Sequence, residues 1–195
     1  MSDTRETILE RSLELFARRG CEAVSVRDIC AAVGIKESSL YYHFRNKRAV
    51  TEELYSLFER RAEELMASLG DALSRGADRN ALLKACAAYF DAFLCDGFCN
   101  RMLRLLGIEQ LSDRRARMLY SRWLFDEPLG FLTRVFGAMT ARRDASALAV
   151  GFYSPVFLYA QRWLLTGTLS EGDKAAFRAD AYRHIRRFLA GLSAR

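Results

Sequence analysis

Proline is nearly absent from this chain of 195 residues, which contains only Pro128 and Pro155. Because proline breaks helices, its scarcity leaves long stretches free to be helical. No segment shows the clean apolar-polar alternation of a strand, and apolar residues recur at helical spacing nearly everywhere. The sequence therefore predicts an all-α fold, with neither an internal repeat nor a low-complexity tract.

Histidine is equally scarce, with His43 and His184 alone. We find no Ser/His/Asp set, no paired-carboxylate site, no glycine-rich phosphate loop and no cluster with metal-ligand spacing in the sequence. The sequence therefore predicts that the protein is not an enzyme and that it holds neither a cofactor nor a metal ion.

Long apolar runs are missing as well. The longest uncharged run, Ala145–Gln161, is shorter than the roughly 20 residues of a membrane span, and Pro155 interrupts it. Charges throughout Ser2–Glu14 do not fit a secretory signal. Five cysteines cannot all pair within one chain, and free thiols are typical of a reducing compartment. We expect a cytoplasmic protein with no membrane partner.

The charge balance is basic, with 30 basic and 24 acidic residues. Only four of the basic residues are lysine, a bias that a GC-rich genome explains better than phosphate binding does. The location of the charge is more informative. Residues 1–24 hold four arginines against five acidic residues, a net charge of −1, whereas residues 25–48 hold five basic and two acidic residues, a net charge of +3.

The basic segment has the signals of two short helices. Ser25 is a good N-cap and Asp28 completes a loose capping box. Gly34 ends this helix, and a second one is expected from Glu37 to Phe44. Two short helices joined by a glycine-containing turn form a helix-turn-helix, which places its second helix in the major groove of DNA. An amphipathic helix that ends at Gly20 precedes this pair.

The run from Ile8 to Val50 resembles the DNA-binding region of TetR-family transcriptional repressors. The resemblance is carried by Gly20, by Ser25-Val26-Arg27-Asp28-Ile29, by Gly34-Ile35 and by Leu40-Tyr41-Tyr42-His43-Phe44-Arg45-Asn46-Lys47. It implies a three-helix DNA-binding domain over residues 1–47 and a helical ligand-binding and dimerisation domain over residues 48–195. It also implies a homodimer that binds a palindromic double-stranded operator and is released by a small-molecule inducer. A ligand-independent DNA-binding regulator of the same fold is the alternative.

The resemblance and the basic segment together define the expected DNA-binding residues. Ser25 and Lys47 correspond to phosphate-contacting positions, Ser38 and Ser39 to base-contacting positions, and the aromatic string to residues that brace the second helix or contact phosphate. Lys36 stands where a serine cap is common, so this cap is weakened. Glu37 either accepts a hydrogen bond from cytosine or, as we prefer, suits the helix N-terminus. The full set is Ser25, Arg27, Lys36, Glu37, Ser38, Ser39, Tyr41, Tyr42, His43 and Lys47.

Helices are expected throughout the rest of the chain. Asn46 can cap a long fourth helix that ends before Gly70, and Gly70–Asn80 is the candidate domain boundary. Further helices are expected near residues 79–95, 98–108, 112–126, 128–141, 144–166 and 171–191. Pro128 is expected in a first turn or at a kink, and Pro155 is expected to bend its helix.

The aromatic residues of these helices are mostly core, but some can line a ligand cavity, and a bend at Pro155 would open space for it. Gln161 and Arg162 could orient a polar or anionic ligand, although a solvated or interfacial arginine is the more common case. The candidate ligand-binding residues are Phe98, Met102, Trp123, Tyr153, Phe157, Gln161 and Arg162.

The last two helices are expected to form the dimer, because a stripe of Phe177, Ala181, His184, Phe188 and Leu192 follows one face. Packing within one subunit explains the same pattern. Cys95 and Cys99, with Cys86, admit a redox role, for which a lowered thiol pKa would be the signature.

Overall fold

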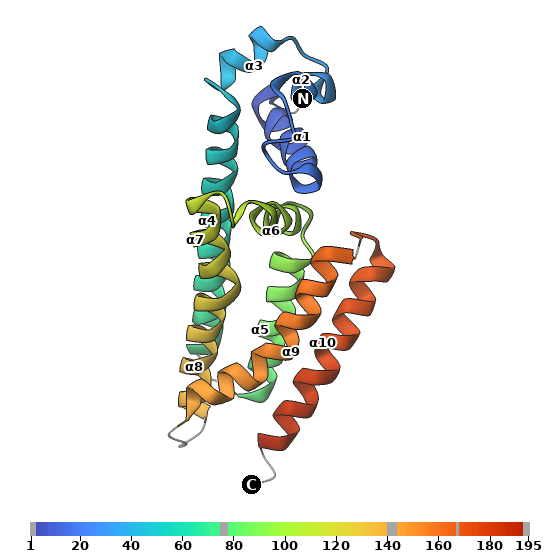
Figure 1. The fold of residues 1–195 in the computed structure, drawn as a ribbon. Coiled ribbons are helices and arrows are strands. Elements are labelled where there is room, and N and C mark those ends of the chain that lie inside the picture. Colours follow the sequence, from blue (N-terminus) through green and yellow to red (C-terminus); the bar gives the residue numbers. More distant parts are fainter. Residues whose placement is uncertain (1–2, 75–77, 140–143, 167, 193–195) are drawn as a thin grey trace. The chain divides into compact units, whose positions relative to one another are not determined.

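The structure is a computed structural model that describes residues 3–74, 78–139, 144–166 and 168–192. Within these ranges every regular element is a helix, which confirms the all-α prediction (Figure 1). None of the described helices is long and apolar enough to cross a membrane. In chain order the elements are α1 (Thr4–Arg19), α2 (Val26–Val33), α3 (Glu37–His43), α4 (Lys47–Ser74), α5 (Arg79–Tyr89), the π-helical η1 (Phe90–Leu94), α6 (Gly97–Glu109), α7 (Arg114–Ser121), the π-helical η2 (Arg122–Asp126), α8 (Glu127–Met139), α9 (Ala145–Thr166) and α10 (Glu171–Leu192).

The chain forms two compact units. The first comprises Met1–Arg61 and Phe98–Tyr120, and the second comprises Ala62–Gly97 and Ser121–Arg195. Helix α4 therefore contributes residues to both units. The boundary expected after residue 47, between a DNA-binding and a ligand-binding domain, stays a prediction, because compact units need not coincide with functional domains.

Helix α1 anchors the first unit. Ile8, Leu13 and Phe16 lie at helical spacing and are almost fully buried, and α1 packs on α2, which in turn packs on α3. The helix ends as predicted at Gly20, whose N–H donates to the carbonyl of Phe16 and whose φ is 76°. A side chain is disfavoured at that φ, so glycine suits this end of the helix.

Helix α4 begins as predicted, because the side-chain oxygen of Asn46 accepts a hydrogen bond of 2.9 Å from the N–H of Ala49. The prediction that it ends before Gly70 is wrong, since the helix continues to Ser74. A glycine inside a helix costs only about 1 kcal/mol relative to alanine, and the next N-cap is Asp78, which accepts from the N–H of Ala81. Residues 75–77 of the expected boundary lie outside the described residues.

In the second unit, η2 continues directly into α8, where the sequence predicts a break between two helices. Pro128 lies in the first turn of α8, as predicted. It has no N–H to offer the carbonyl of Leu124 four residues earlier. The buried hydroxyl of Tyr153 donates to that carbonyl at 2.9 Å instead, so α9 supplies a donor to the carbonyl that the proline leaves without its helical partner.

Helix α9 contains Pro155 and changes direction partway along its length (Figure 1). Beside it lies α10, whose His184 places Nε2 3.0 Å from the carbonyl of Phe152. Phe188 meets Phe152 edge to face with ring centroids 5.3 Å apart, and Phe177 stacks on Trp163 at 5.0 Å. Much of the apolar stripe of α10 is thus used within one subunit, which is the alternative that the sequence left open.

Candidate functional site

Helices α2 and α3 form the helix-turn-helix that the sequence predicts. The Ser25 hydroxyl accepts a hydrogen bond of 3.1 Å from the N–H of Asp28, and the Asp28 carboxylate accepts from the N–H of Ser25 at 2.8 Å. This capping box starts α2, and Gly34 ends it with φ 78° and ψ 34°, the left-handed conformation. The N–H groups of Gly34 and Ile35 both donate to the carbonyl of Cys30, so the turn between the two helices is closed by the backbone itself.

Helix α3 presents most of its predicted DNA-binding residues to solvent. Glu37, Ser38, Tyr41 and Tyr42 are exposed and Ser39 and His43 are half-buried, while Leu40 alone is fully buried. Tyr42 has 86% of its surface exposed and meets the His43 ring edge to face at 5.1 Å. Tyr41 beside it is 49% exposed, so α3 offers a polar and aromatic face suited to a partner.

The weak cap predicted at Lys36 is present in the structure. Lys36 is the N-cap of α3 and makes no capping hydrogen bond through its side chain. Helix α3 therefore lacks the stabilisation of about 1 kcal/mol that a serine cap provides. Its exposed lysine side chain remains available to an anionic partner.

The Ser25 hydroxyl is committed to Asp28. Besides accepting from the Asp28 N–H, it donates its proton to the Asp28 carboxylate at 2.8 Å. The hydrogen bonds from the Ser25 backbone N–H and hydroxyl hold the pKa of Asp28 below its usual value. A phosphate oxygen can only accept a hydrogen bond, so it competes with Asp28 for the single proton of Ser25.

Arg27 and Glu37 join the two helices. The Arg27 Nε lies 3.1 Å from a Glu37 carboxylate oxygen, and both side chains are substantially exposed. This gives Glu37 a contact that neither of the two sequence-based interpretations includes. An exposed ion pair contributes about 0–1 kcal/mol, so Arg27 can exchange Glu37 for a phosphate at little cost.

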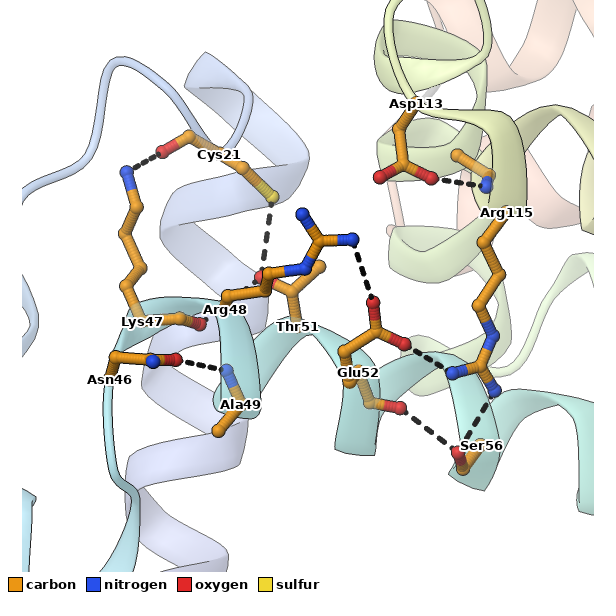
Figure 2. A network of polar contacts seen from close by, with 11 residues as sticks. Cys21, Asn46, Lys47, Arg48, Ala49, Thr51, Glu52, Ser56, Asp113 and Arg115 are labelled. Atoms are coloured by element: carbon orange, nitrogen blue, oxygen red, sulfur yellow. Dashed lines mark hydrogen bonds and ion pairs between the residues drawn. The ribbon is translucent and has the colours of Figure 1, made fainter.

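Lys47 does more than face solvent at the start of α4. Its Nζ lies 2.5 Å from the carbonyl oxygen of Cys21 (Figure 2) and 2.9 Å from that of Val24. Two of the three ammonium donors therefore bind the turn between α1 and α2. The sequence identifies Lys47 by its resemblance to a phosphate-binding position, but these carbonyl contacts leave no signal in the local sequence.

A chain of polar contacts continues along α4 toward α7 (Figure 2). The Glu52 carboxylate pairs with Arg48 at 3.6 Å and also binds Arg115. Arg115 reaches the Ser56 hydroxyl at 3.0 Å as well. Within the first unit, this network ties the start of α4 to α7 through alternating charges.

The cysteines are free thiols. Burial raises the pKa of Cys21 to about 11 and that of Cys86 to about 12, and it also raises the pKa of Cys30 and of Cys95. A raised pKa lowers the fraction of thiolate that redox chemistry needs, which argues against the redox role considered for Cys86 and Cys95. Among the described residues, no group of three or more His, Cys, Asp or Glu side chains is placed to hold a metal ion.

The seven candidate ligand-binding residues are divided between the two units. Phe98 lies under the Arg61 guanidinium, 4.4 Å from it, and Met102 is fully buried, both in the first unit. The other five belong to the second unit. There, Arg162 borders a shallow groove together with Asp173 and Asp180, whose negative charges disfavour the anionic ligand considered from the sequence.

An apolar cavity of about 50 Å³ lies within the second unit. Tyr153 is the one predicted ligand-binding residue in its wall. Sequence reasoning missed the others, because an apolar residue at helical spacing looks the same whether it faces a cavity or a packed core. The lining residues are Met66, Leu69, Ala85, Cys86, Tyr89, Phe90, Pro128, Phe131, Leu132, Tyr153, Val156 and Ile185.

Sequence comparisons find relatives for the N-terminal part of the chain. Residues 8–54 match the family described as bacterial regulatory proteins, tetR family. Relatives include the transcriptional repressor KstR2 of Rhodococcus jostii, 36% identical over 43% of this chain and 40% of that protein. The regulator AcrR of Shigella flexneri is 33% identical over 32% of this chain and 29% of its own length. The chain thus spans less than half the length of the curated relatives that it matches.

Structure comparisons extend the likeness to the whole chain. KstR2 of Mycobacterium tuberculosis, described as a ketosteroid transcriptional regulator, aligns over 98% of this chain and 95% of its own, with a TM-score of 0.68 and 20% identity. The fatty acid degradation regulator FadR of Bacillus halodurans aligns over 100% and 99%, with a TM-score of 0.67 and 17% identity. At these identities the likeness shows the fold. The N-terminal segment thus matches the TetR family of bacterial regulatory proteins, and the chain as a whole shares the fold of these solved regulators.

Proposed function

We propose that this protein is a transcriptional repressor that binds a palindromic operator as a homodimer through α2 and α3. The observation that carries the proposal is the exposed polar and aromatic face of α3, presented by a capped α2 and a closed turn. A helix held in this way can enter the major groove. Arg27 on α2 and Lys36 at the N-cap of α3 would then bind the phosphates that flank the groove. Both lysine and arginine side chains neutralise phosphate and release counterions.

Tyr42, the more exposed of the two tyrosines of α3, provides the test of this proposal. Tyr42→Ala is expected to weaken binding to the DNA upstream of the protein's own gene by about tenfold, or 1.4 kcal/mol, because it removes the most exposed aromatic contact of α3 without touching the core. Fluorescence anisotropy with labelled duplex DNA measures this. Leu111→Ala is the matched control, since Leu111 is 90% exposed and lies outside α2 and α3. Equal binding by wild type and Tyr42→Ala would contradict the site assignment.

We propose that the second copy of the chain packs on the outer face of α9. Val150, Leu158 and Leu165 lie seven to eight residues apart and are 51%, 67% and 79% exposed. Residues at this spacing share one face of a helix, and the face between them carries the small exposed residues Gly151 and Ser154. We therefore expect dimerisation through the last two helices to use this exposed face of α9. The apolar stripe of α10 is less suitable, because most of it already packs on α9.

The cavity of the second unit suggests the chemistry of an inducer. No charged side chain lines it, and the hydroxyl of Tyr153 is already engaged by Leu124. Its volume of about 50 Å³ is well below that of ligand pockets in general, so a ligand must be small or must widen it. We propose a neutral, apolar small molecule as the inducer.

Filling the cavity tests this proposal. Ala85→Leu is expected to abolish the heat of binding of neutral apolar probes, such as medium-chain alcohols, and their release of DNA, because Ala85 lines the cavity and is buried. Isothermal titration calorimetry measures the binding. Ala176→Leu is the control, because Ala176 is exposed beside the polar groove. If no probe binds the wild type, the ligand-independent regulator becomes the better description.

A further inference from the structure

Glu109, the last residue of α6, is the one buried charged side chain among the described residues, with 8% of its surface exposed. Its carboxylate oxygen Oε1 accepts a hydrogen bond of 2.7 Å from the backbone N–H of Cys21, which lies 88 residues away in the sequence. Isolating a carboxylate from water is costly unless it is hydrogen-bonded. The buried carboxylate of Glu109 therefore depends on its hydrogen bond from the turn between α1 and α2, and this indicates that Glu109 has a specific role at that turn.

The backbone of Cys21 is held from two sides. Glu109 accepts a hydrogen bond from the N–H of Cys21, while Lys47 donates to the carbonyl oxygen of Cys21 at 2.5 Å. The Sγ atom of Cys21 lies 3.6 Å from the hydroxyl of Thr51, also on α4. One residue of the turn is thus fixed by polar groups from α4 and from α6, four residues before the capping box that starts α2.

The close approach of α6 depends on the glycine at the end of α1. A Cβ atom at position 20 would lie 3.1 Å from Oε1 of Glu109 and 3.1 Å from a methyl carbon of Ile108. Both distances are tighter than ordinary contacts between carbon or oxygen atoms. Gly20 thus leaves room for Glu109 to reach the turn, in addition to adopting the positive φ that ends α1.

We propose that Glu109 is a positioning residue for DNA binding, through which the end of α6 fixes the α1–α2 turn and hence the start of α2. The inference rests on the proposed DNA-binding function. Glu109 itself contacts no DNA in this proposal. It acts by holding the Cys21 peptide, so that α2 and α3 keep the orientation in which their outer residues meet the groove.

The test compares three variants of the full-length protein. Glu109→Ala removes the acceptor, and we expect it to raise the Kd for the operator duplex at least about tenfold. Glu109→Gln keeps an oxygen acceptor for the Cys21 N–H, and we expect its Kd to stay close to that of the wild type. Glu14→Gln is the matched control, because Glu14 forms a half-buried ion pair of 3.7 Å with Arg101 that also joins α1 to α6 but lies away from the turn.

Hydrogen exchange separates positioning from general stability. In Glu109→Ala we expect faster exchange in a peptide covering residues 21–29 and unchanged exchange in α1 and α4. Wild-type operator affinity in Glu109→Ala, or faster exchange throughout the first unit, overturns the inference. If the wild type binds no DNA, the proposed function fails, and the exchange measurement still decides whether Glu109 holds the turn.

Discussion

Replacing Leu40 with alanine is expected to abolish operator binding and to lower the free energy of unfolding by about 2–5 kcal/mol. Leu40 is the only buried residue of α3 and has no exposed surface. The helix has seven residues and no side-chain cap, so its attachment to the rest of the unit depends on this side chain and on the buried Phe44 that follows. Urea unfolding followed by circular dichroism measures the stability, and fluorescence anisotropy measures the binding.

A matched variant on the same helix separates attachment from recognition. Ser38→Ala changes an exposed residue of α3, and we expect it to leave the unfolding free energy within about 0.5 kcal/mol of the wild type. Tryptophan emission serves as a control, because Trp123 and Trp163 both belong to the second unit and should keep their native spectrum in Leu40→Ala. Wild-type stability and affinity in Leu40→Ala would contradict the role assigned to this side chain.

Replacing Lys47 with methionine is expected to reduce both stability and DNA binding. The change removes two hydrogen bonds from the ammonium and leaves the carbonyl groups of Cys21 and Val24 without that donor. We expect the free energy of unfolding to fall by about 1–3 kcal/mol, the cost of a buried carbonyl that loses its partner, because the Cys21 carbonyl still accepts from the N–H of Val24 at 3.3 Å. If the third N–H also contacts a phosphate, the slope of log Kd against log salt concentration falls by about one.

Lys36→Met is the counterpart of this variant. Lys36 is exposed and forms no capping hydrogen bond, so its loss is expected to leave stability unchanged while lowering the salt slope by about one. Binding titrations at several salt concentrations and urea unfolding of both variants measure the difference. Equal stability losses in the two variants would show that the carbonyl contacts of Lys47 contribute little.

Local signals in the sequence predicted the helix-turn-helix well. The ends of α1 and α2 follow from Gly20, from Ser25 with Asp28 and from Gly34, because each of these residues acts on a backbone within a few positions of itself. The weak cap at Lys36 was predicted from the family resemblance, in which a serine is common at this position. The family resemblance named Lys47 as a phosphate-binding residue but gave no indication of the carbonyl groups that it binds.

Contacts over long sequence distances could not be predicted in this way. The acceptor of the Cys21 N–H is on α6, and the donor to the Leu124 carbonyl is on α9. Nothing in the spacing of these residues reveals the pairing, because it arises only when separate helices pack together. The continuation of α4 through Gly70 was missed for a related reason, since tertiary packing outweighs a weak local preference against helix.

The short length of α3 has a consequence for the measured affinity of the protein. Seven residues without a side-chain cap do not form a stable helix by themselves. The helix therefore exists only in the fraction of molecules in which Leu40 is packed in the core of the first unit. The apparent dissociation constant equals the intrinsic one divided by that fraction. A substitution that increases the fraction of molecules with Leu40 packed therefore tightens DNA binding without adding a contact to DNA, until that fraction approaches one.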